Sequence, residues 1–237
     1  MRRTDLDPRL SSAAEYVRQG AVFADIGTDH AYLPVFLLEE GRISRAYAAD
    51  IAQGPLSRAE STVRAHGRMA DVTLVLTDGL RGMENYGITD IAICGMGGEN
   101  IVSILENAPF VKDPAVRLIL QPMTRPSVVR HYLAEGGFAV LDETYCRDRD
   151  KLYTVIAAAY TGERYALTRA EAELGKTGLH APTPLFAERV RRAITAQRRK
   201  LDGLRLGGTE NSEEEEYLAF LEKWMENYDS TGASTAR

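Results

Sequence analysis

Three aspartates in the first third of the 237-residue chain have the type and spacing that suit ligand binding. Asp25, Asp50 and Asp78 each stand at or just after the end of a short apolar segment, and Gly27 and Gly79 follow two of them. Carboxylates accept hydrogen bonds from hydroxyl groups, and glycine lets the backbone pass close to a bound molecule. One such aspartate is explained by capping of the next helix, but three in corresponding positions favour a nucleotide-like ligand.

The loop after Asp25 narrows the class of ligand. It reads Gly27-Thr28-Asp29-His30 and lacks the G-x-G-x-x-G pattern of dinucleotide-binding loops. The charge of Asp29 would oppose a pyrophosphate at the N-terminus of the following helix, whereas a cationic sulfonium without phosphate meets no such conflict. The loop therefore favours S-adenosylmethionine, with Asp25 and Gly27 on the cofactor and with Asp29 and His30 toward the methyl acceptor.

The elements that must position these residues follow from the hydrophobic spacing, which predicts five strand–helix alternations and then two consecutive strands. The strands are expected at 21–25, 46–49, 72–76, 91–94, 116–120, 138–145 and 152–160. The helices are expected at 5–19, 31–40, 55–66, 99–107 and 126–135. Because the connection between the last two strands is too short for a crossover, these strands form an antiparallel hairpin. The predicted fold class is α/β, with a Rossmann-like seven-stranded methyltransferase sheet.

The composition changes after Gly162. A loop at 177–184 leads into an amphipathic helix at 184–206, and a second helix begins with the run Glu213–Glu216. Two such helices joined by a Gly-rich loop predict a coiled-coil-like helical hairpin. The expected organisation is a methyltransferase domain over 1–162, a hairpin domain over 163–229 and a disordered tail over 230–237.

The overall composition suits a cytoplasmic protein. Hydrophobic residues make up 44% and charged residues 27% of the chain, with a net charge of −5. We expect no signal peptide, no membrane segment and no metal, and we expect Cys94 and Cys146 to be buried thiols. A monomer is favoured, and a weak homodimer stays open.

Five motifs occur in the order DIGTDHAYLP, DIAQGPL, TDGL, ICGMGGENI and RLILQP. In this order and spacing they resemble the bacterial tRNA adenine-N1 methyltransferases, which act on adenine 22 of tRNA. The resemblance covers about residues 10–160, and the helical hairpin also fits it. It implies S-adenosylmethionine as cofactor, with S-adenosylhomocysteine as product, and tRNA as partner. Met123 stands where some members carry asparagine.

Roles are assigned to the site residues on this basis. The catalytic candidates are Asp29, which would stabilise the cationic product ring and orient the base, and His30 as its partner. The expected cofactor contacts are Arg9, Asp25, Gly27, Thr28, Asp50, Ile51, Asp78, Gly79, Gly95 and Met96. The expected substrate contacts are Tyr32, Gly97, Gly98, Gln121, Pro122, Arg189, Arg192, Arg198, Arg199 and Lys200.

Plainer interpretations stay open for several of these residues. Asp29 has the position of a helix cap, Tyr32 fits the core face of a helix, and the GMGG segment suits a tight turn. Pro122 alone is enough to end a strand. The basic helix carries seven cations against two acids, which the glutamates of the next helix would partly balance. The rival functions are a methyltransferase for a small molecule or protein, and a non-catalytic protein that binds RNA or S-adenosylmethionine.

Overall fold

The computed structural model of the protein describes residues 4–207 and 211–231. The chain divides into two compact units, with the division between Ala166 and Leu167, and each unit is described by itself. The boundary expected from the sequence lies four residues earlier. Of the expected tail over 230–237, Ser230 still belongs to the last helix, and residues 232–237 lie outside the described part of the chain.

A seven-stranded sheet forms the centre of the first unit, in the order β3-β2-β1-β4-β5-β7-β6. The strands are β1 (Ala21–Ile26), β2 (Ile43–Asp50), β3 (Val72–Leu76), β4 (Asp90–Gly97), β5 (Arg117–Thr124), β6 (Phe138–Asp148) and β7 (Lys151–Tyr160). The first five are parallel, and β7 pairs antiparallel with both β5 and β6. The predicted fold class is therefore confirmed.

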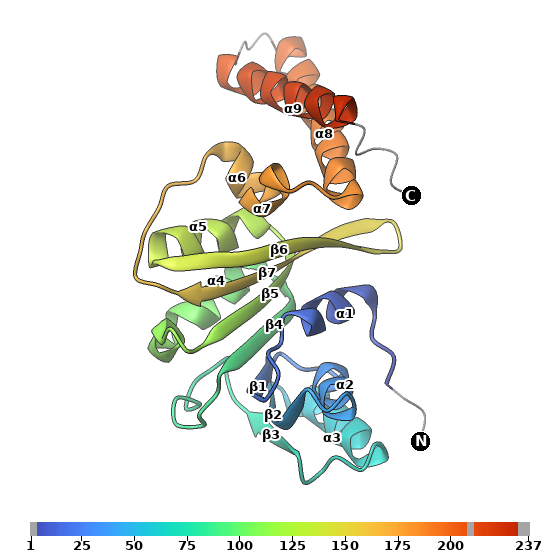
Figure 1. Ribbon diagram of the computed structural model, residues 1–237, viewed down its shortest axis with the longest axis vertical. Coiled ribbons are helices and arrows are strands. Elements are labelled where there is room, and N and C mark those ends of the chain that lie inside the picture. The colour runs from blue at the N-terminus through green and yellow to red at the C-terminus, as the bar shows by residue number, and fades with distance from the viewer. Residues whose placement is uncertain (1–3, 208–210, 232–237) are drawn as a thin grey trace. The chain divides into compact units, whose positions relative to one another are not determined.

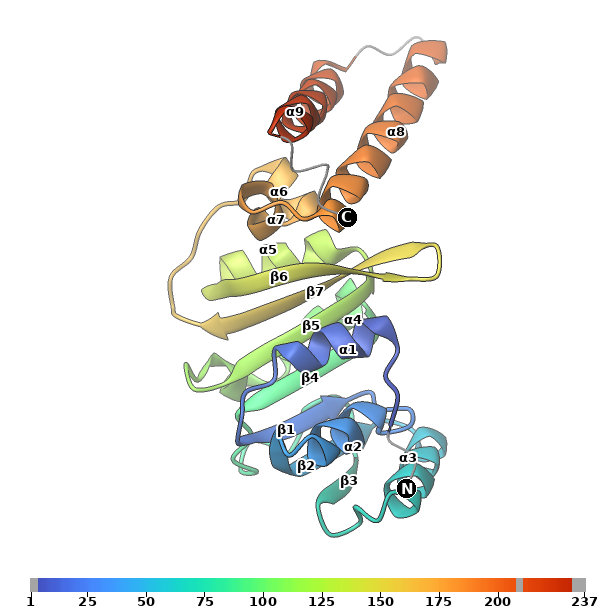
Figure 2. The same ribbon diagram turned by 45° about the vertical axis from the view of Figure 1, so that its right-hand side comes forward.

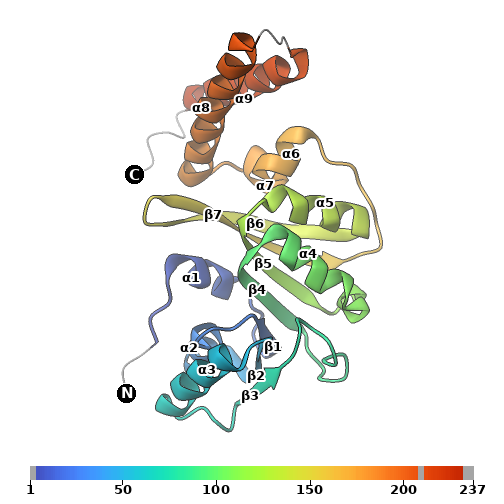
Figure 3. The same ribbon diagram turned by 180° about the vertical axis from the view of Figure 1, so that it is seen from behind.

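Helices cover both faces of this sheet. The first unit contains α1 (Pro8–Glu15), α2 (Tyr32–Glu39), α3 (Gln53–Ala65), α4 (Gly98–Glu106), α5 (Pro126–Gly136) and the 3-10 turn η1 (Pro109–Lys112). Helices α1, α2 and α3 share one apolar core with the sheet, whereas α4 and α5 share the other. Figure 2 shows α1 across β4 and β5, and Figure 3 shows α4 and α5 from the opposite side.

The central strands are apolar because both of their faces are covered. In β1, Phe23 and Ala24 are fully buried, and each belongs to a different core. Because the strands run parallel, their carboxyl ends lie at one edge of the sheet, where β1, β2 and β3 stand side by side (Figure 1). The sheet thereby brings together the loops that follow Asp25, Asp50 and Leu76.

The second unit consists of helices. They are α6 (Arg169–Leu174), α7 (Lys176–His180), α8 (Pro184–Leu206) and α9 (Ser212–Ser230). Residues 177–180, expected in a loop, belong to α7, so that part of the prediction is wrong. Gly178 lies in this helix because it allows close packing and not because the chain turns there. A Cβ at this position would lie 2.0 Å from the Phe186 ring. No helix in the described part of the chain is long and apolar enough to cross a membrane.

Candidate active site

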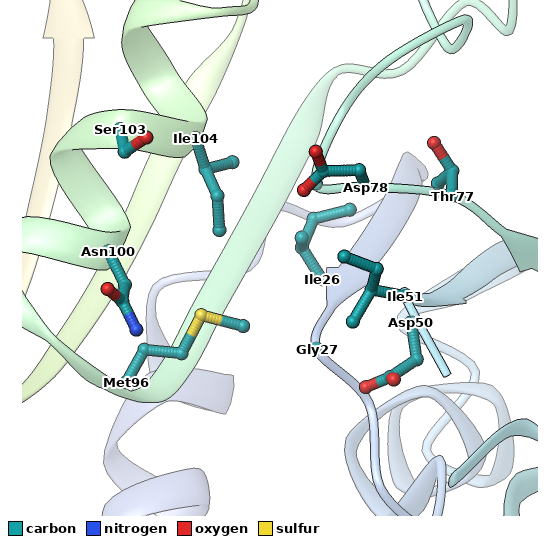
Figure 4. A pocket seen from close by; sticks show the side chains of 11 residues that line it. Ile26, Gly27, Asp50, Ile51, Thr77, Asp78, Met96, Asn100, Ser103 and Ile104 are labelled. Atoms are coloured by element: carbon teal, nitrogen blue, oxygen red, sulfur yellow. The ribbon is translucent and has the colours of Figure 1, made fainter. Parts of the chain in front are cut away.

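A cavity of about 280 Å³ opens at the carboxyl edge of the sheet, between the ends of β1, β2 and β3 and the start of α4 (Figure 4). Figure 4 shows Asp50, Ile51 and Asp78 on one side of the cavity, and Met96, Asn100 and Ile104 on the other. The full lining comprises Ile26, Gly27, Asp50, Ile51, Thr77, Asp78, Gly79, Met96, Asn100, Ser103 and Ile104. We call it the adenosine-side cavity, because its two carboxylates and apolar walls suit a ribose and a flat base.

A second cavity of about 260 Å³ lies on the other side of Gly27. We call it the acceptor-side cavity. Its lining comprises Asp7, Arg9, Leu10, Asp25, Gly27, Thr28, Asp29, His30, Ala31, Tyr32, Leu33, Cys94 and Gly95. Gly27 lines both cavities, so they meet at a residue that has no side chain.

Gly27 is required at this point for two reasons. Its φ of +76° lies in the left-handed region, which L side chains rarely adopt. A Cβ would also lie 2.0 Å from the Cε of Met96, and that methyl group lines the adenosine-side cavity. A side chain at position 27 would therefore strain the loop and push Met96 out of place.

Arg9 brings a guanidinium group to the acceptor-side cavity from the first turn of α1. Its Nη2 donates to Asp7 Oδ2 at 2.7 Å, its Nη1 lies 3.2 Å from Met123 Sδ, and its Nε lies 3.4 Å from Asp148 Oδ2. The guanidinium also lies 5.6 Å from the centre of the Tyr153 ring. Met123, which departs from the motif, thus contacts Arg9, a residue that lines the cavity.

Asp25 lies buried at the floor of the same cavity, 8% exposed. Burial raises the pKa of its carboxyl group to about 6; a hydrogen bond with Thr28 opposes this rise, and the charge of Asp50 adds to it. The neighbouring Cys94 is half-buried, so the expectation of a buried thiol holds for Cys146 but not for Cys94. Desolvation nevertheless raises the pKa of the Cys94 thiol. Cys94 is therefore a neutral thiol at neutral pH and does not add a negative charge beside Asp25.

The loop of Asp29, His30 and Tyr32 forms the outer wall of the acceptor-side cavity. The N-cap of α2 is Ala31, with a φ of +54°, so Asp29 does not cap this helix. Thr28 Oγ1 accepts the Ala31 N–H at 3.0 Å and closes the turn, which leaves Asp29 exposed. The Asp29 Oδ1 atom accepts hydrogen bonds from Nε and Nη2 of Arg58 on α3, the former at 2.8 Å. The capping interpretation of Asp29 is wrong.

The rings of His30 and Tyr32 stack on each other, with centroids 5.0 Å apart and planes 4° apart. Tyr32 is 42% exposed, so the interpretation that it faces the core is wrong. His30 Nε2 lies 3.4 Å from Asp29 Oδ2, the oxygen that Arg58 does not contact. A carboxylate oxygen and an aromatic face therefore stand side by side at one cavity.

The four residues of the GMGG segment, Gly95 to Gly98, have two different positions. Gly95 and Met96 line the cavities, whereas the described linings do not include Gly97 or Gly98. Gly98 serves packing, because a Cβ there would lie 2.4 Å from the carbonyl oxygen of Arg125.

Gln121 and Pro122 lie on β5, next to the Gly95–Met96 part of β4 that lines the cavities. The side chain of Gln121 is fully buried, and its Oε1 accepts the Gly95 N–H at 3.1 Å. Pro122 pairs with Met96, and β5 continues to Thr124, so Pro122 does not end the strand. Gln121 thus supports the Gly95 loop from beneath.

Several lining residues were not predicted from the sequence. Those of the adenosine-side cavity are Ile26, Thr77, Asn100, Ser103 and Ile104, and those of the acceptor-side cavity are Asp7, Leu10, Ala31, Leu33 and Cys94. Positions 100, 103 and 104 lie on one face of the first turns of α4, which is a helical spacing that the sequence does carry. No group of three or more His, Cys, Asp or Glu among the described residues is arranged to hold a metal ion.

Some cationic side chains of α8 pair with carboxylates of α9, and some line a cavity on α8 itself. Arg198 pairs with Glu222 and Lys200 with Glu214, both at 2.7 Å, and both partners lie on α9. Arg191, Arg192 and Arg199 line a shallow cavity of about 360 Å³ on α8, together with Glu188, Thr195 and Ala196. Arg192 pairs with Glu188 and Arg191 with Asp229. Arg199 has no carboxylate partner among the described residues, and Arg189 is partly buried.

Comparison with known proteins gives the family. Residues 6–156 match a methyltransferase domain family. The tRNA (adenine(22)-N(1))-methyltransferase of Bacillus subtilis is 36% identical over 166 residues, which cover 70% of this chain and 69% of that protein. The crystal structure of the B. subtilis m1A22 tRNA methyltransferase TrmK is 28% identical and covers 94% of this chain and 97% of its own, with a TM-score of 0.78. A Streptococcus pneumoniae protein solved with S-adenosyl-L-methionine is also 28% identical and covers 92% and 98%, with a TM-score of 0.80. The chain belongs to the methyltransferase domain family and, within it, to the tRNA (adenine(22)-N(1))-methyltransferases.

Proposed function

We propose that this protein transfers a methyl group from S-adenosylmethionine to N1 of an adenine in tRNA, at position 22 as in its relatives. The observation that carries this proposal is the meeting of two cavities at Gly27, one lined by ribose-type carboxylates and the other by the Asp29–Tyr32 loop. A tRNA substrate also supports our proposal that the protein acts in the cytoplasm.

The described residues fit this cofactor. Asp50 would accept hydrogen bonds from the ribose hydroxyls, and Asp78 and Asn100 would contact the edge of the adenine. Arg9 would hold the carboxylate of the methionine moiety, while Asp25 offers the nearby cationic groups a buried carboxylate. When bound, the cofactor supplies an electrophilic methyl group on a sulfonium.

The acceptor side needs little proton chemistry. Adenine N1 carries a free lone pair at neutral pH, so orientation and proximity provide most of the acceleration. The His30–Tyr32 stack offers a flat surface to the base, and Asp29 Oδ2 offers an acceptor to the exocyclic amine. The same carboxylate stabilises the positive charge that develops on the ring. The base must leave its stack to reach this loop, which predicts dependence on tRNA shape.

The test uses the full chain and an unmodified tRNA transcript. Labelled methyl groups should enter the wild-type transcript and be found at N1 of adenine 22. A transcript with guanine at position 22 should take up none. Uptake by small molecules or proteins but not by tRNA would support the rival methyltransferase, and binding without any transfer would support the non-catalytic alternative.

We further propose that the shallow cavity on α8 that Arg191, Arg192 and Arg199 line contacts the phosphate backbone of tRNA. We call it the arginine cavity. Arg199 supports this role because it has no carboxylate partner within residues 4–207 and 211–231, whereas Arg198 on the same helix is paired with Glu222. A phosphate contact adds about one unit to the slope of log K against log salt concentration. Arg199→Gln should lower that slope for tRNA binding by about one unit. Arg198→Gln, with the same change of charge, should alter it much less; equal effects would refute a specific role of the cavity.

A further inference from the structure

We infer that Arg58 on α3 is a positioning residue for Asp29, and this inference rests on the proposed function of the Asp29 loop. Arg58 does not belong to the described lining of either cavity. It therefore acts through the carboxylate that it holds and does not contact the reacting groups.

The first observation is the geometry of the contact. Nε and Nη2 of Arg58 both donate to the same oxygen of Asp29, Oδ1. Two donors of one planar group on one atom restrict the rotation of the carboxylate. The Oδ2 atom is then left on the side of His30, whose Nε2 lies 3.4 Å away. That is the oxygen which the mechanism assigns to the exocyclic amine of adenine.

The second observation is the element that carries Arg58. Helix α3 begins directly after Asp50 and Ile51, which line the adenosine-side cavity. Asp50 Oδ1 accepts the Ala52 N–H at 2.8 Å and so joins the end of β2 to the start of α3. Arg58 therefore connects the proposed ribose-binding end of β2 to the acceptor loop through the first turns of α3.

The third observation excludes a merely local role. Arg64, on the same helix, pairs with Glu60 four residues away, as surface cations on helices commonly do. Arg58 instead reaches a loop 29 residues earlier in the chain. Both side chains of the Arg58–Asp29 pair are at least half exposed, and exposed pairs contribute little to folding stability. The pair is thus better explained by orientation of Asp29 than by stabilisation of the fold.

The test compares Arg58→Gln with Arg64→Gln, which removes the same charge from the same helix. We expect Arg58→Gln to lower kcat for tRNA methylation about tenfold, because a misplaced catalytic group slows the chemical step. The Kd for S-adenosylmethionine, the KM for tRNA and the thermal unfolding midpoint should stay within about twofold or a few degrees of wild type. Arg64→Gln should leave all four quantities near the wild-type values.

A double-mutant cycle with Asp29→Asn gives the decisive readout. If Arg58 acts through Asp29, the double variant Asp29→Asn/Arg58→Gln should be no slower than Asp29→Asn alone. An additional tenfold loss in the double variant, or a rise in the KM for tRNA that depends on salt, would overturn the inference and assign Arg58 to direct RNA binding. Wild-type kcat in Arg58→Gln would also overturn it. Failure of the proposed function is distinguishable, because the wild-type protein would then methylate no tRNA.

Discussion

Two carboxylates, one in each unit, have opposite environments. Asp25 in the sheet unit is buried, and burial raises the pKa of its side chain to about 6. Glu214 in the helical unit accepts hydrogen bonds from Arg169, Gln197 and Lys200, which lower its pKa to about 2. Glu214 already has its cationic partners within the chain, whereas Asp25 faces a cavity. The difference separates a carboxylate whose charge is balanced within the fold from one that lines a cavity.

The same contrast holds for the surrounding residues. On α8, Arg198, Lys200 and Arg205 each pair with a glutamate of α9. At the edge of the sheet, Asp50 and Asp78 line a cavity. Position on a cavity, rather than the lack of an ion pair, therefore marks the candidate binding residues, because Asp78 also pairs with Arg81 and Asp29 with Arg58.

The largest expected effect is that of Asp29→Asn. Loss of the negative charge removes stabilisation of the cationic product ring, and kcat should fall about a hundredfold. Binding of S-adenosylmethionine should change little. Glu60→Gln, which removes an exposed carboxylate that also pairs with an arginine, is the control and should keep wild-type activity. Equal activity of Asp29→Asn and wild type in single-turnover methylation would remove Asp29 from the catalytic residues.

The next effect concerns the glycine between the cavities. Gly27→Ala should weaken binding of S-adenosylmethionine at least tenfold in calorimetry, because the new methyl group displaces Met96, and it should cost about 1–2 kcal/mol of stability from backbone strain. Gly20→Ala has a similar φ of +78° with no heavy atom within 4 Å of the new Cβ. It should show the same loss of stability with normal binding. Parallel losses of binding in both variants would contradict a role of Gly27 in the site.

A smaller effect is expected from pH. The pKa of Asp25 in the folded chain lies above its ordinary value of 3.8, so the native state binds this proton more tightly than the unfolded chain. As the pH rises from about 4 to about 6, the contribution of Asp25 to the free energy of unfolding therefore falls by roughly 2–3 kcal/mol. Above about pH 6 this contribution no longer changes with pH.

Cofactor binding provides the measurement for Asp25. Because the ionised form attracts a cation, affinity for S-adenosylmethionine should rise about tenfold from pH 5 to pH 7. Asp25→Asn should abolish this dependence. A pH-independent affinity of the wild-type protein would show that Asp25 does not face the cationic part of the cofactor.

The smallest effect belongs to the hairpin. Glu214 has a lowered pKa, so its stabilising contribution is present above pH 4.5 and is lost as the pH falls toward about 2. Between pH 5 and pH 8 the contribution of Glu214 to the stability of this unit should therefore not change with pH.

A double-mutant cycle of Arg198→Gln with Glu222→Gln should give a coupling free energy below about 1 kcal/mol. A larger coupling would mean that the exposed pairs hold the two helices together.

Much of the sheet unit follows from local sequence. A buried parallel strand needs apolar residues on both faces, so β1 and β3 can be located to within a residue, and the carboxylates that follow are expected at one edge. Helix α8 is also located correctly from its amphipathic spacing, and in the structure Thr183 caps it and Pro184 takes its first position. These are features of a few consecutive residues.

The remaining features depend on contacts between distant residues. Gly178 reads as a turn residue, and only the Phe186 ring that packs on it explains its helical position. Arg58 reads as an ordinary surface residue, and only the fold brings it to Asp29. The division of the α8 cations is likewise invisible in the sequence, because it depends on which of them lie opposite the glutamates of α9.

The division of the site by Gly27 bears on inhibition. A ligand that spans both cavities would pass Gly27, which offers no side chain for a mutation to shorten. The mutations left at that point only add atoms, and each would push Met96 into the space that the cofactor needs. A compound built across this glycine should therefore meet few resistance mutations there that leave the enzyme active.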